Sequence, residues 1–449
     1  MSDFPSASLL DVAQLNRLVT VPNALQGLFR RRRRPVAVAT RLDVDGAALR
    51  FLAGLRRRHD GRPVWVRLGT DRALLLLSVD DVRRVLEGSP DPFASDPPAK
   101  RKGMEAFQPH ALTLSRGEVW AKRRRFTEQI LDTPAPVHRL GERFVAVACE
   151  EAQAMRDGAY PRLTWDDWHP MFRRLMRRVV LGDGAADDED VTDLLAELMS
   201  EANGLPGGRS ERFGPFVEKL RSYVEDPEPD SLVSLFADAH PDPETAATGQ
   251  VPHWMFATAD TLAINSLRAL ALIASHPEQR AAVERELSEA APTAEGVAGL
   301  RYLRACLHEG MRLWPTTPLL ARETVSATEL DGGSVPEGTQ VAFSNLLFHR
   351  DRDCVAYADS FAPEAWTEGD AGRDWAFNHF SHGPQGCPGV ELALLLAGAV
   401  LTELLTTTSV ALGSPRLDPA RPLPTMLDFY AVRFRLGPGP QSAASSRSQ

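Results

Sequence analysis

The sequence predicts a mainly α-helical fold with a small β region. Apolar residues recur at the 3.6-residue spacing of amphipathic helices through most of the middle and end of the chain. Runs with the pattern of strands are few and short. The chain has 449 residues, 43% of them hydrophobic, so it can bury a large core. No internal repeat is visible, and a single large domain is expected.

The first part of the body is expected to hold one helix and a small sheet. Residues 47–58 have helical periodicity, and two strand-like runs, 64–67 and 73–77, flank a turn at Gly69. Breakers such as glycine and proline separate the helical segments that follow. These predicted helices cover residues 119–131, 138–156, 165–181, 191–202, 215–223, 253–274, 278–290 and 302–313.

The last third alternates between short strands, irregular chain and one long helix. Residues 318–343 show turn signals between short strand-like runs, and residues 346–378 look irregular, which is long for a compact domain and favours a functional segment. An apolar helix is predicted over residues 389–405. Strands are expected near Val410 and over residues 430–436.

The predicted organisation has three parts. Residues 1–35 form an N-terminal extension with five consecutive arginines at 30–34, residues 36–436 form the domain, and residues 437–449 form a disordered tail rich in Gly, Pro and Ser. The arginine-containing extension is consistent with an interfacial basic helix or a targeting segment. A solvated surface run is the favoured interpretation, because acidic residues are unusual in a transit peptide.

Charge and cysteine content exclude several classes of function. The net charge of -9 argues against a nucleic-acid partner, because binding to phosphates needs clustered cations. Cys149, Cys306, Cys354 and Cys387 lie far apart, so neither a zinc site nor a disulfide framework is indicated, and a cytoplasmic location fits. The longest apolar run, residues 392–401, is shorter than a membrane span. No membrane span is expected.

One cysteine lies in a glycine-rich turn that leads directly into an apolar helix. The segment from Phe380 to Gly389 reads FSHGPQGCPG. Gly383 and Gly389 allow positive φ and a close approach of the backbone to a flat ligand. Cys387 precedes a helix N-terminus, where amide N–H groups favour a thiolate over a thiol. Phe380 can shield the sulfur from water.

The spacing F-x-x-G-x-x-x-C-x-G resembles the haem-binding loop of the cytochrome P450 family. The resemblance extends over residues 47–436 and implies the cytochrome P450 fold, a single large haem-binding domain. It also implies haem b with Cys387 as the axial thiolate ligand of the iron. Phe380, Gly383 and Gly389 would shape the loop. Gln385 departs from the family, which usually has Arg or His there to help hold a haem propionate.

A second landmark is the pair Glu309 and Arg312, placed one helical turn apart. It resembles the E-x-x-R helix of the family, in which the two side chains form a buried structural lock beneath the haem. The family's third partner is an arginine of a P-E-R-F-like motif, and Ala365 stands at that position. Either Arg350 or Arg352 substitutes for it, or the lock is incomplete.

A third landmark lies inside the long helix predicted over residues 253–274. The sequence ATADT at 257–261 resembles the family's oxygen-activating motif, which implies that Thr261 hydrogen-bonds to oxygen and Asp260 delivers protons. Thr258 replaces the glycine that usually leaves room for oxygen. The groove is therefore expected to be narrower or more polar.

Three further residues are implied as ligands of the haem propionates. Trp120 and Arg124 match a W-x-x-x-R pattern, and Arg322 follows the E-x-x-R helix; guanidinium groups suit carboxylates because they bind both oxygens. Arg123 and Arg125 are interpreted as a solvated basic face or, with equal weight, as a docking site for an acidic ferredoxin.

The resemblance predicts a monooxygenase that inserts one atom of O2 into a small apolar organic substrate. Electrons would come from a ferredoxin and its reductase, because no flavin or nicotinamide fingerprint follows a strand. The alternatives are a peroxide-using or non-oxygenating haem-thiolate enzyme and a non-catalytic haem-binding protein. Four of the 51 basic residues are lysines, a bias that suggests a bacterial source and, with the soluble form, secondary metabolism. The expected pocket walls are residues 93–114, 203–216, 255–261, 316–320 and 425–427.

Overall fold

The computed structural model describes residues 4–204 and 210–439, and these residues are mainly helical with small β sheets, as predicted. The α-helices are α1 (Leu9–Leu15), α2 (Val21–Gln26), α3 (Arg33–Arg41), α4 (Val44–Arg58), α5 (Val79–Glu87), α6 (Pro98–Met104), α7 (Gly117–Ile130), α8 (Gly141–Ala159), α9 (Trp165–Leu181), α10 (Glu189–Ala202), α11 (Phe213–Glu225), α12 (Phe236–Ala239), α13 (Val251–Phe256), α14 (Ala263–Ser275), α15 (Pro277–Glu289), α16 (Ala294–Ala298), α17 (Arg301–Leu313), α18 (Asn345–His349), α19 (Glu364–Thr367) and α20 (Val390–Thr407). Two short π-helices, η1 (Asn16–Thr20) and η7 (Ala257–Leu262), connect α1 to α2 and α13 to α14.

The strands form a mixed five-stranded sheet, a three-stranded sheet and a hairpin. The strands are β1 (Val64–Leu68), β2 (Asp71–Leu75), β3 (Phe93–Ala94), β4 (Arg162–Thr164), β5 (Leu319–Thr324), β6 (Thr328–Leu330), β7 (Gly333–Val335), β8 (Gln340–Ser344), β9 (Thr408–Ser414) and β10 (Arg433–Pro438). The large sheet has the order β1-β2-β8-β5-β3, and the small one has the order β4-β10-β9. β5 pairs antiparallel with β8 in a register that places Arg322 opposite Val341.

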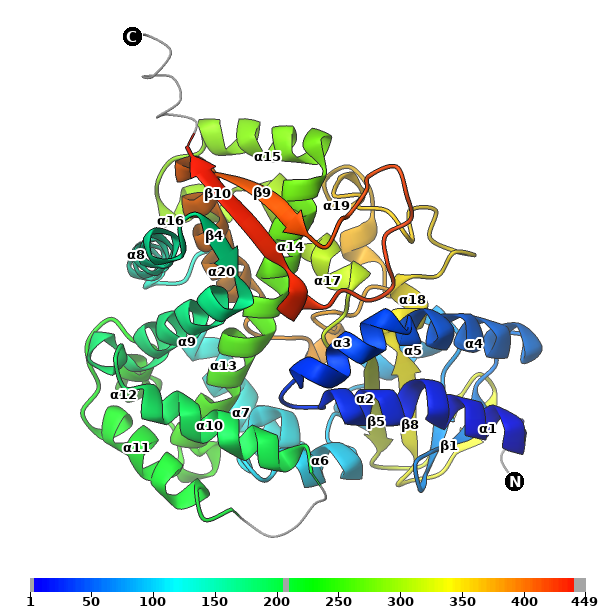
Figure 1. Cartoon of the computed structure of the whole chain (residues 1–449). Helices are drawn as coiled ribbons and strands as arrows, with labels where there is room; N and C mark the ends of the chain where they lie inside the picture. Colours follow the sequence, from blue (N-terminus) through cyan, green and yellow to red (C-terminus); the bar gives the residue numbers. More distant parts are fainter. Residues whose placement is uncertain (1–3, 205–209, 440–449) are drawn as a thin grey trace, which may run out of the picture.

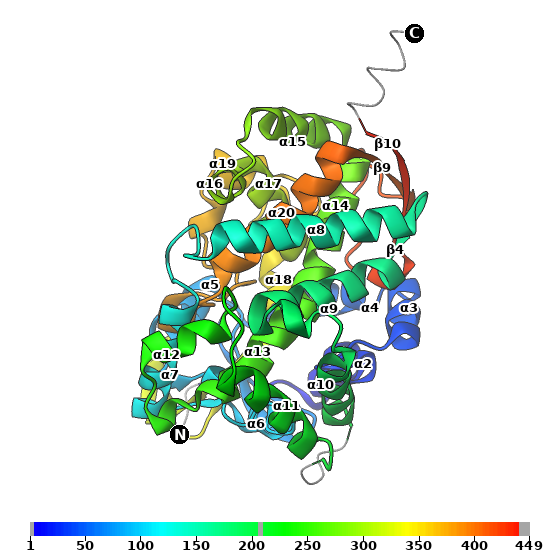
Figure 2. The same cartoon turned by 90° about the vertical axis from the view of Figure 1, so that its left-hand side faces the viewer.

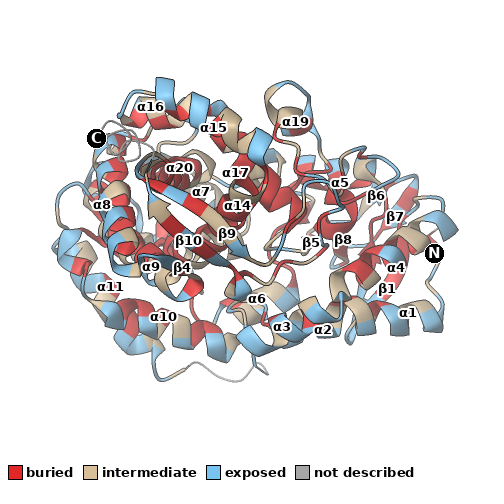
Figure 3. Cartoon of the chain, turned by 45° about the horizontal axis from the view of Figure 1, so that its top comes forward, coloured by how far each residue is buried: buried red, intermediate tan, exposed pale blue. Residues whose placement is uncertain are grey.

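Two hydrophobic cores hold the molecule together. The larger core contains the inner faces of α8, α9, α14, α17 and α20, and the smaller one lies between the five-stranded sheet and α4 and α5. Helices α14, α17 and α20 are largely buried in the middle of the molecule (Figures 1 and 3). The view in Figure 2 shows α8 and α9 lying across α14 and α20. These buried helices bring the cysteine loop, the E-x-x-R pair and the ATADT segment toward one region.

Two helical stretches are long and apolar enough to cross a membrane, judged by length and composition alone. They are residues Pro243–Ser275 and Val390–Thr407, and 72% and 61% of their most apolar windows lie buried inside the fold. Core helices of this length pass the same test. The expectation of no membrane span therefore remains a prediction.

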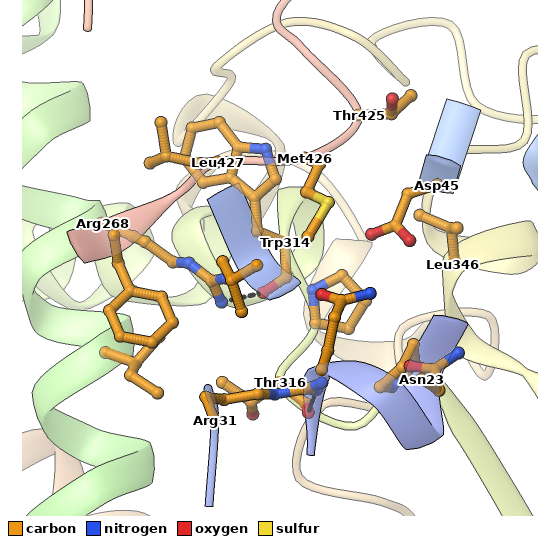
Figure 4. Close-up of a pocket in the computed structure, with 16 residues that line it drawn as sticks. Asn23, Arg31, Asp45, Arg268, Trp314, Thr316, Leu346, Thr425, Met426 and Leu427 are labelled. Carbon is orange, nitrogen blue, oxygen red and sulfur yellow. Dashed lines mark hydrogen bonds between the residues drawn. The ribbon is translucent and has the colours of Figure 1, made fainter. Parts of the chain in front are cut away.

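The N-terminal part is more structured than the sequence suggested. Helices α1, α2, α3 and α5 were not predicted, and residue 35, the expected end of the extension, falls within α3. The favoured interpretation of the arginines at 30–34 as a merely solvated run is wrong for Arg31. Its Nη2 donates to the carbonyl of Thr316 at 3.0 Å, and its side chain lines a cavity together with Asp45 and Arg268 (Figure 4).

Candidate functional site

The cysteine loop is held in place by backbone hydrogen bonds and by α7. The amide of Cys387 donates to the carbonyl of Phe380 at 2.8 Å, which closes the turn ahead of α20. Arg124 Nη1 donates to the carbonyl of Gly386 at 2.6 Å. Thr133 Oγ1 donates to the carbonyl of Pro388 at 2.5 Å. The Cys387 side chain is exposed, and its exposed surface faces a large cavity.

The two glycines of the cysteine loop, Gly383 and Gly389, have different roles. Gly383 has φ 70°, and a Cβ there would lie 2.2 Å from the carbonyl oxygen of Leu86 on α5, so only glycine fits. Gly389 has φ -97°, so the expectation of positive φ at this position is wrong. A Cβ at Gly389 would be 3.5 Å from Leu131, an ordinary contact.

Desolvation by the surrounding cavity walls outweighs the helix terminus at the Cys387 thiol. Desolvation raises the pKa of Cys387, while a hydrogen bond from the Gly389 amide and the charge of Arg124 lower it by less. The backbone N–H group at the helix N-terminus acts in the expected direction, toward the thiolate, but without a metal desolvation outweighs it. A coordinated metal ion deprotonates a thiol outright, so a thiolate is the form expected of an iron ligand.

The E-x-x-R pair forms a fully buried lock. Arg312 donates to both carboxylate oxygens of Glu309, at 2.6 and 2.8 Å, and neither side chain is exposed. The remaining Arg312 N–H groups donate to four backbone carbonyls, those of His349, Tyr357, Ala358 and Ser360.

The third partner of the lock is Trp366. Its indole Nε1 donates to Glu309 Oε1 at 2.8 Å, and the amide of Ala362 donates to Oε2 at 2.9 Å. Neither of the two arginines considered from the sequence fills this role, because Arg350 and Arg352 both pair with Asp359. The lock is complete, with a neutral indole in place of the family's arginine.

The ATADT segment adopts the π-helix η7, which interrupts the predicted continuous helix. π-helical turns inside α-helices are frequent at functional sites. A π-helical turn is wider than an α-helical turn, so the helix is locally widened here although Thr258 replaces the family's usual glycine. Thr258 and Thr261 both line the cavity that Cys387 faces. Asp260 points elsewhere: its Oδ1 lies 2.9 Å from Nε2 of His169 on α9.

The cavity has an empty volume of about 1710 Å³, part of it open to solvent, and its lining is mostly apolar. Most of the predicted site residues lie on its wall: Trp120, Arg124, Thr261, Arg322, Phe380, Gln385, Cys387 and Gly389. Gly383, Glu309 and Arg312 lie outside the wall and support the loop or the lock.

Some of the expected pocket segments lie elsewhere. Residues 425–427 line the cavity shown in Figure 4, and Asn203 lines a second large cavity that also contains Asp260. Residues 205–209 of the expected segment 203–216 are outside the described residues. Segments 93–114, 255–261 and 316–320 each contribute to the cavity wall as expected.

Several buried polar atoms on this wall have no hydrogen-bond partner among the described residues. They are Thr127 Oγ1, Asn265 Oδ1, Arg322 Nε, Asn378 Oδ1, His379 Nδ1 and both polar atoms of the Gln385 side chain. Buried polar groups in folded proteins are nearly always paired, so a group of unpaired atoms on one wall indicates a polar ligand.

The same wall carries two cations that form no ion pair with any described residue, the buried Arg322 and the half-buried Lys100. Arg322 is 3% exposed, and burial lowers its pKa to about 10. The pKa of Lys100 falls to about 7 because of burial and the nearby charge of Arg322. Lys100 donates only to Thr113 Oγ1 and to the carbonyls of Ser95 and Thr113. No signal in the sequence pointed to Lys100 beyond its place in an expected pocket segment.

Arg123 corrects another expectation. It is buried, and its Nη1 donates to Ser115 Oγ at 2.7 Å while Nε donates to the carbonyl of Glu244. It therefore belongs neither to a solvated face nor to a docking surface. Arg125 is exposed, as either interpretation requires. Trp120 and Arg124 lie on the cavity wall, and Arg124 also pairs with Glu128.

The residues present fit a flat, largely apolar cofactor that carries carboxylates and a metal ion that binds a sulfur ligand. The wall supplies apolar surface, one cysteine sulfur that faces the cavity, and cations that lack anions. A carboxylate placed near Lys100 and Arg322 would compensate both charges.

Comparisons with known proteins agree with this geometry. The family model for cytochrome P450 matches residues 216–426. The chain is 26% identical to cyclooctat-9-en-7-ol 5-monooxygenase of Streptomyces melanosporofaciens over 79% of this chain and 83% of that protein. Human cytochrome P450 4V2 is 30% identical, and the match covers 47% of this chain and 42% of the human protein.

A solved structure supports the fold. The retinoic acid-bound cyanobacterial CYP120A1 superimposes with a TM-score of 0.70 at 19% identity, and the match covers 86% of this chain and 94% of that structure. The fold and the site together define a haem-thiolate protein. Residues 216–426, which include the E-x-x-R helix and the cysteine loop, match the cytochrome P450 family, whose members are monooxygenases with haem b and an axial cysteine thiolate, and the fold of the described chain is that of a cytochrome P450.

Proposed function

We propose that Cys387 is the axial ligand and that Arg322, Lys100 and the Trp120–Arg124 pair hold the propionates. The observation that carries the proposal is that Cys387 turns its exposed surface into a mostly apolar cavity whose wall also holds two cations without an ion-pair partner, Arg322 and Lys100. Among the four cysteines, Cys387 is the one that lines this cavity. Gln385, with both polar atoms unpaired, is placed to donate an amide hydrogen to a carboxylate.

The haem would supply oxygen activation and the two-electron oxidation of the substrate. Thr261 lies in the wall between this cavity and the second one, since it lines both. Asp260 and His169 line only the second cavity, which has an empty volume of about 1250 Å³. A proton from water there would pass from His169 Nε2 to Asp260 Oδ1 and then to Thr261 Oγ1.

The substrate is proposed to be a mainly apolar organic molecule that is hydroxylated. The cavity wall includes Trp254, Phe256 and Leu320. Burial lowers the pKa of His253 to about 4, so its imidazole is neutral and can hydrogen-bond to one oxygen-bearing group. The names of the similar proteins are in keeping with this, since one acts on cyclooctat-9-en-7-ol and the other binds retinoic acid.

The electron donors are proposed to be a ferredoxin and its reductase, and the setting is proposed to be cytoplasmic secondary metabolism. A third cavity shares Phe380 with the wall that Cys387 faces. It is also lined by Arg301, Arg304 and His308. This cavity and the exposed Arg125 would suit an acidic ferredoxin. The rival function, a peroxide-using or non-oxygenating enzyme, is motivated by Thr258 and Gln385.

The decisive experiment measures the ligand, the electrons and the product separately. The reduced carbon monoxide complex of the purified protein is expected to show the absorption band typical of thiolate-ligated haem, and Cys387→Ser is expected to lose this band while Cys306→Ser keeps it. A ligand spectrum typical of histidine coordination would overturn the assignment of Cys387. With a surrogate ferredoxin system, product should form in proportion to NADPH and O2 consumed. Product formed from peroxide alone would favour the rival function, and haem-dependent partner binding without turnover would favour a non-catalytic protein.

A further inference from the structure

Large exposed hydrophobic side chains concentrate at the N-terminal end of the chain. Eight such residues stand out among the described ones, and seven lie within residues 9–42: Leu9, Leu10, Val21, Leu25, Leu28, Val38 and Leu42, each at least 50% exposed. The eighth, Tyr160, lies at the end of α8. A concentration of exposed apolar side chains in one segment indicates an interaction site, whereas scattered ones need no explanation.

The spacing of these residues places several on one face of a continuous helical stretch. From α1 through η1 to α2 the chain stays helical, and the exposed positions include Leu10, Arg17, Val21 and Leu25, with Leu28 just beyond the end of α2. The intervals of four and seven residues between the four helical positions are those of one helix face. The opposite side buries Leu15 and Val19 against the small core. The stretch therefore presents apolar side chains both to the core and to the outside.

The segment is also strongly basic in an acidic protein. Residues 4–42 contain seven arginines and one aspartate, a net charge of +6, whereas the whole chain carries -9. Arg33 pairs with Asp166, and Asp11 pairs with Arg58. Among the described residues, no carboxylate lies in ion-pair contact with the arginines at positions 17, 30, 32, 34 and 41. These cations and the exposed leucines together are complementary to a surface that is both anionic and apolar.

The segment is anchored firmly, so the outward face has a fixed orientation. Asn203 at the end of α10 accepts a hydrogen bond from the Phe29 amide at 2.8 Å and donates to the carbonyl of Arg30 at 2.6 Å. Tyr430 donates to the carbonyl of Arg31 at 2.8 Å. The side chain of Arg31 turns inward to the cavity that it shares with Asp45 (Figure 4). Helices α1, α2 and α3 lie along the outer edge of the molecule (Figure 3).

We propose that this N-terminal face, the seven exposed apolar side chains with the five arginines that form no ion pair, docks the protein on an anionic phospholipid surface. The leucines would enter the acyl boundary while the arginine heads stay at the phosphates, as long side chains do at interfaces. Leu28 and Phe29 also line the second cavity, which reaches Asp260 and Thr261. Docking would therefore bring that cavity close to the lipid, where an apolar substrate partitions.

The test is flotation of the full-length haem-loaded protein with vesicles. Vesicles of 70% phosphatidylcholine and 30% phosphatidylglycerol should carry the protein upward, and vesicles of phosphatidylcholine alone should carry less of it. Leu25→Ser with Leu28→Ser should lower the partition coefficient about tenfold per residue. Arg17→Ala with Arg34→Ala should lower it about fivefold per residue at low salt.

The matched control is Tyr160→Ser, which removes an equally exposed large side chain outside the face and should leave partitioning unchanged. Retention of the haem spectrum and of the melting temperature will show that each variant is folded. Equal flotation with neutral and anionic vesicles, or insensitivity to both double variants, would overturn the proposal. A further outcome is a dimer of the protein in the absence of lipid. If the Leu25 and Leu28 changes dissociate that dimer, the face binds a second copy of the chain, and the lipid proposal is overturned.

Discussion

Two buried arginines of this protein have opposite surroundings. Arg312 donates every hydrogen bond that it can, to Glu309 and to four carbonyls, and is fully buried. Arg322 is almost as buried, yet its Nε has no partner among the described residues, and its other contacts are to Ser381 Oγ and the carbonyl of Ala321. A buried charge with its anion built into the chain is part of the structure. Arg322 has no such anion and keeps an unpaired N–H group on a cavity wall, where a ligand can supply the anion.

The difference separates the lock from the cavity wall. Removing a partner in the lock should destabilise the protein itself, because it leaves an uncompensated charge inside. Removing a cation from the wall should weaken haem binding and leave the apoprotein as stable or more stable. The following variants test that contrast.

The largest effect is expected for Glu309→Ala. It leaves Arg312 buried without its carboxylate, which costs about 3–5 kcal/mol of the free energy of unfolding. Urea unfolding of the apoprotein measures the loss. Glu391→Ala breaks the partly exposed pair with Arg304 and serves as the control, with a cost below about 1 kcal/mol. Equal costs for the two variants would contradict the structural role of the lock.

Trp366→Phe should have the next largest effect. It removes one hydrogen bond from the Glu309 carboxylate while keeping an aromatic ring, at a cost of about 1.5–3 kcal/mol. Thermal or urea unfolding is the measurement. Trp375→Phe, which changes a partly buried indole outside the lock, is the control. If Arg350→Ala lowered haem retention and stability while Trp366→Phe changed neither, Trp366 would not be the third partner.

Arg322→Met should separate haem binding from folding. The loss of a charge-assisted bond to a propionate should weaken haem affinity about tenfold to thirtyfold, measured by transfer of haem to apomyoglobin. The apoprotein should unfold at an equal or higher urea concentration, because an uncompensated buried charge has been removed. Loss of apoprotein stability would place Arg322 with the lock instead.

Lys100 should make haem affinity depend on pH. Its pKa of about 7 in the empty cavity should rise when a propionate is bound, so binding takes up a proton above pH 7. Haem affinity should therefore be level below pH 7 and fall severalfold between pH 7 and 9. Lys100→Met should weaken binding and flatten this dependence, whereas exposed Lys102→Met should change neither. Adding Gln385→Arg to the Lys100→Met variant should restore its affinity for haem.

The predicted landmarks depend on short spacings, and most of these were right. The i, i+3 pair of Glu309 and Arg312 forms because both side chains share one helix face. The turn at Gly383 and the start of α20 beyond Cys387 follow from glycine and the apolar run. The predicted helices and strands of the body each have a counterpart within a few residues, apart from the break at η7.

The residues that complete the site could not be found in the same way. Trp366 lies 57 residues from Glu309, and His169 lies 91 residues from Asp260. Lys100 and Arg123 look like ordinary basic residues until packing buries them. The helices α1 and α2 were hard to predict because exposed apolar residues such as Leu10, Val21 and Leu25 blur their amphipathic pattern.

The sequence by itself determined the class of fold, the cysteine loop and the acid–base pair of the lock, because each is set by contacts between near neighbours in the chain. Only the tertiary structure decided which distant side chains finish these sites, which cations are left without an anion, and which apolar residues remain outside. Those outcomes depend on how buried helices pack and on the desolvation of charges, and neither is written in local spacing.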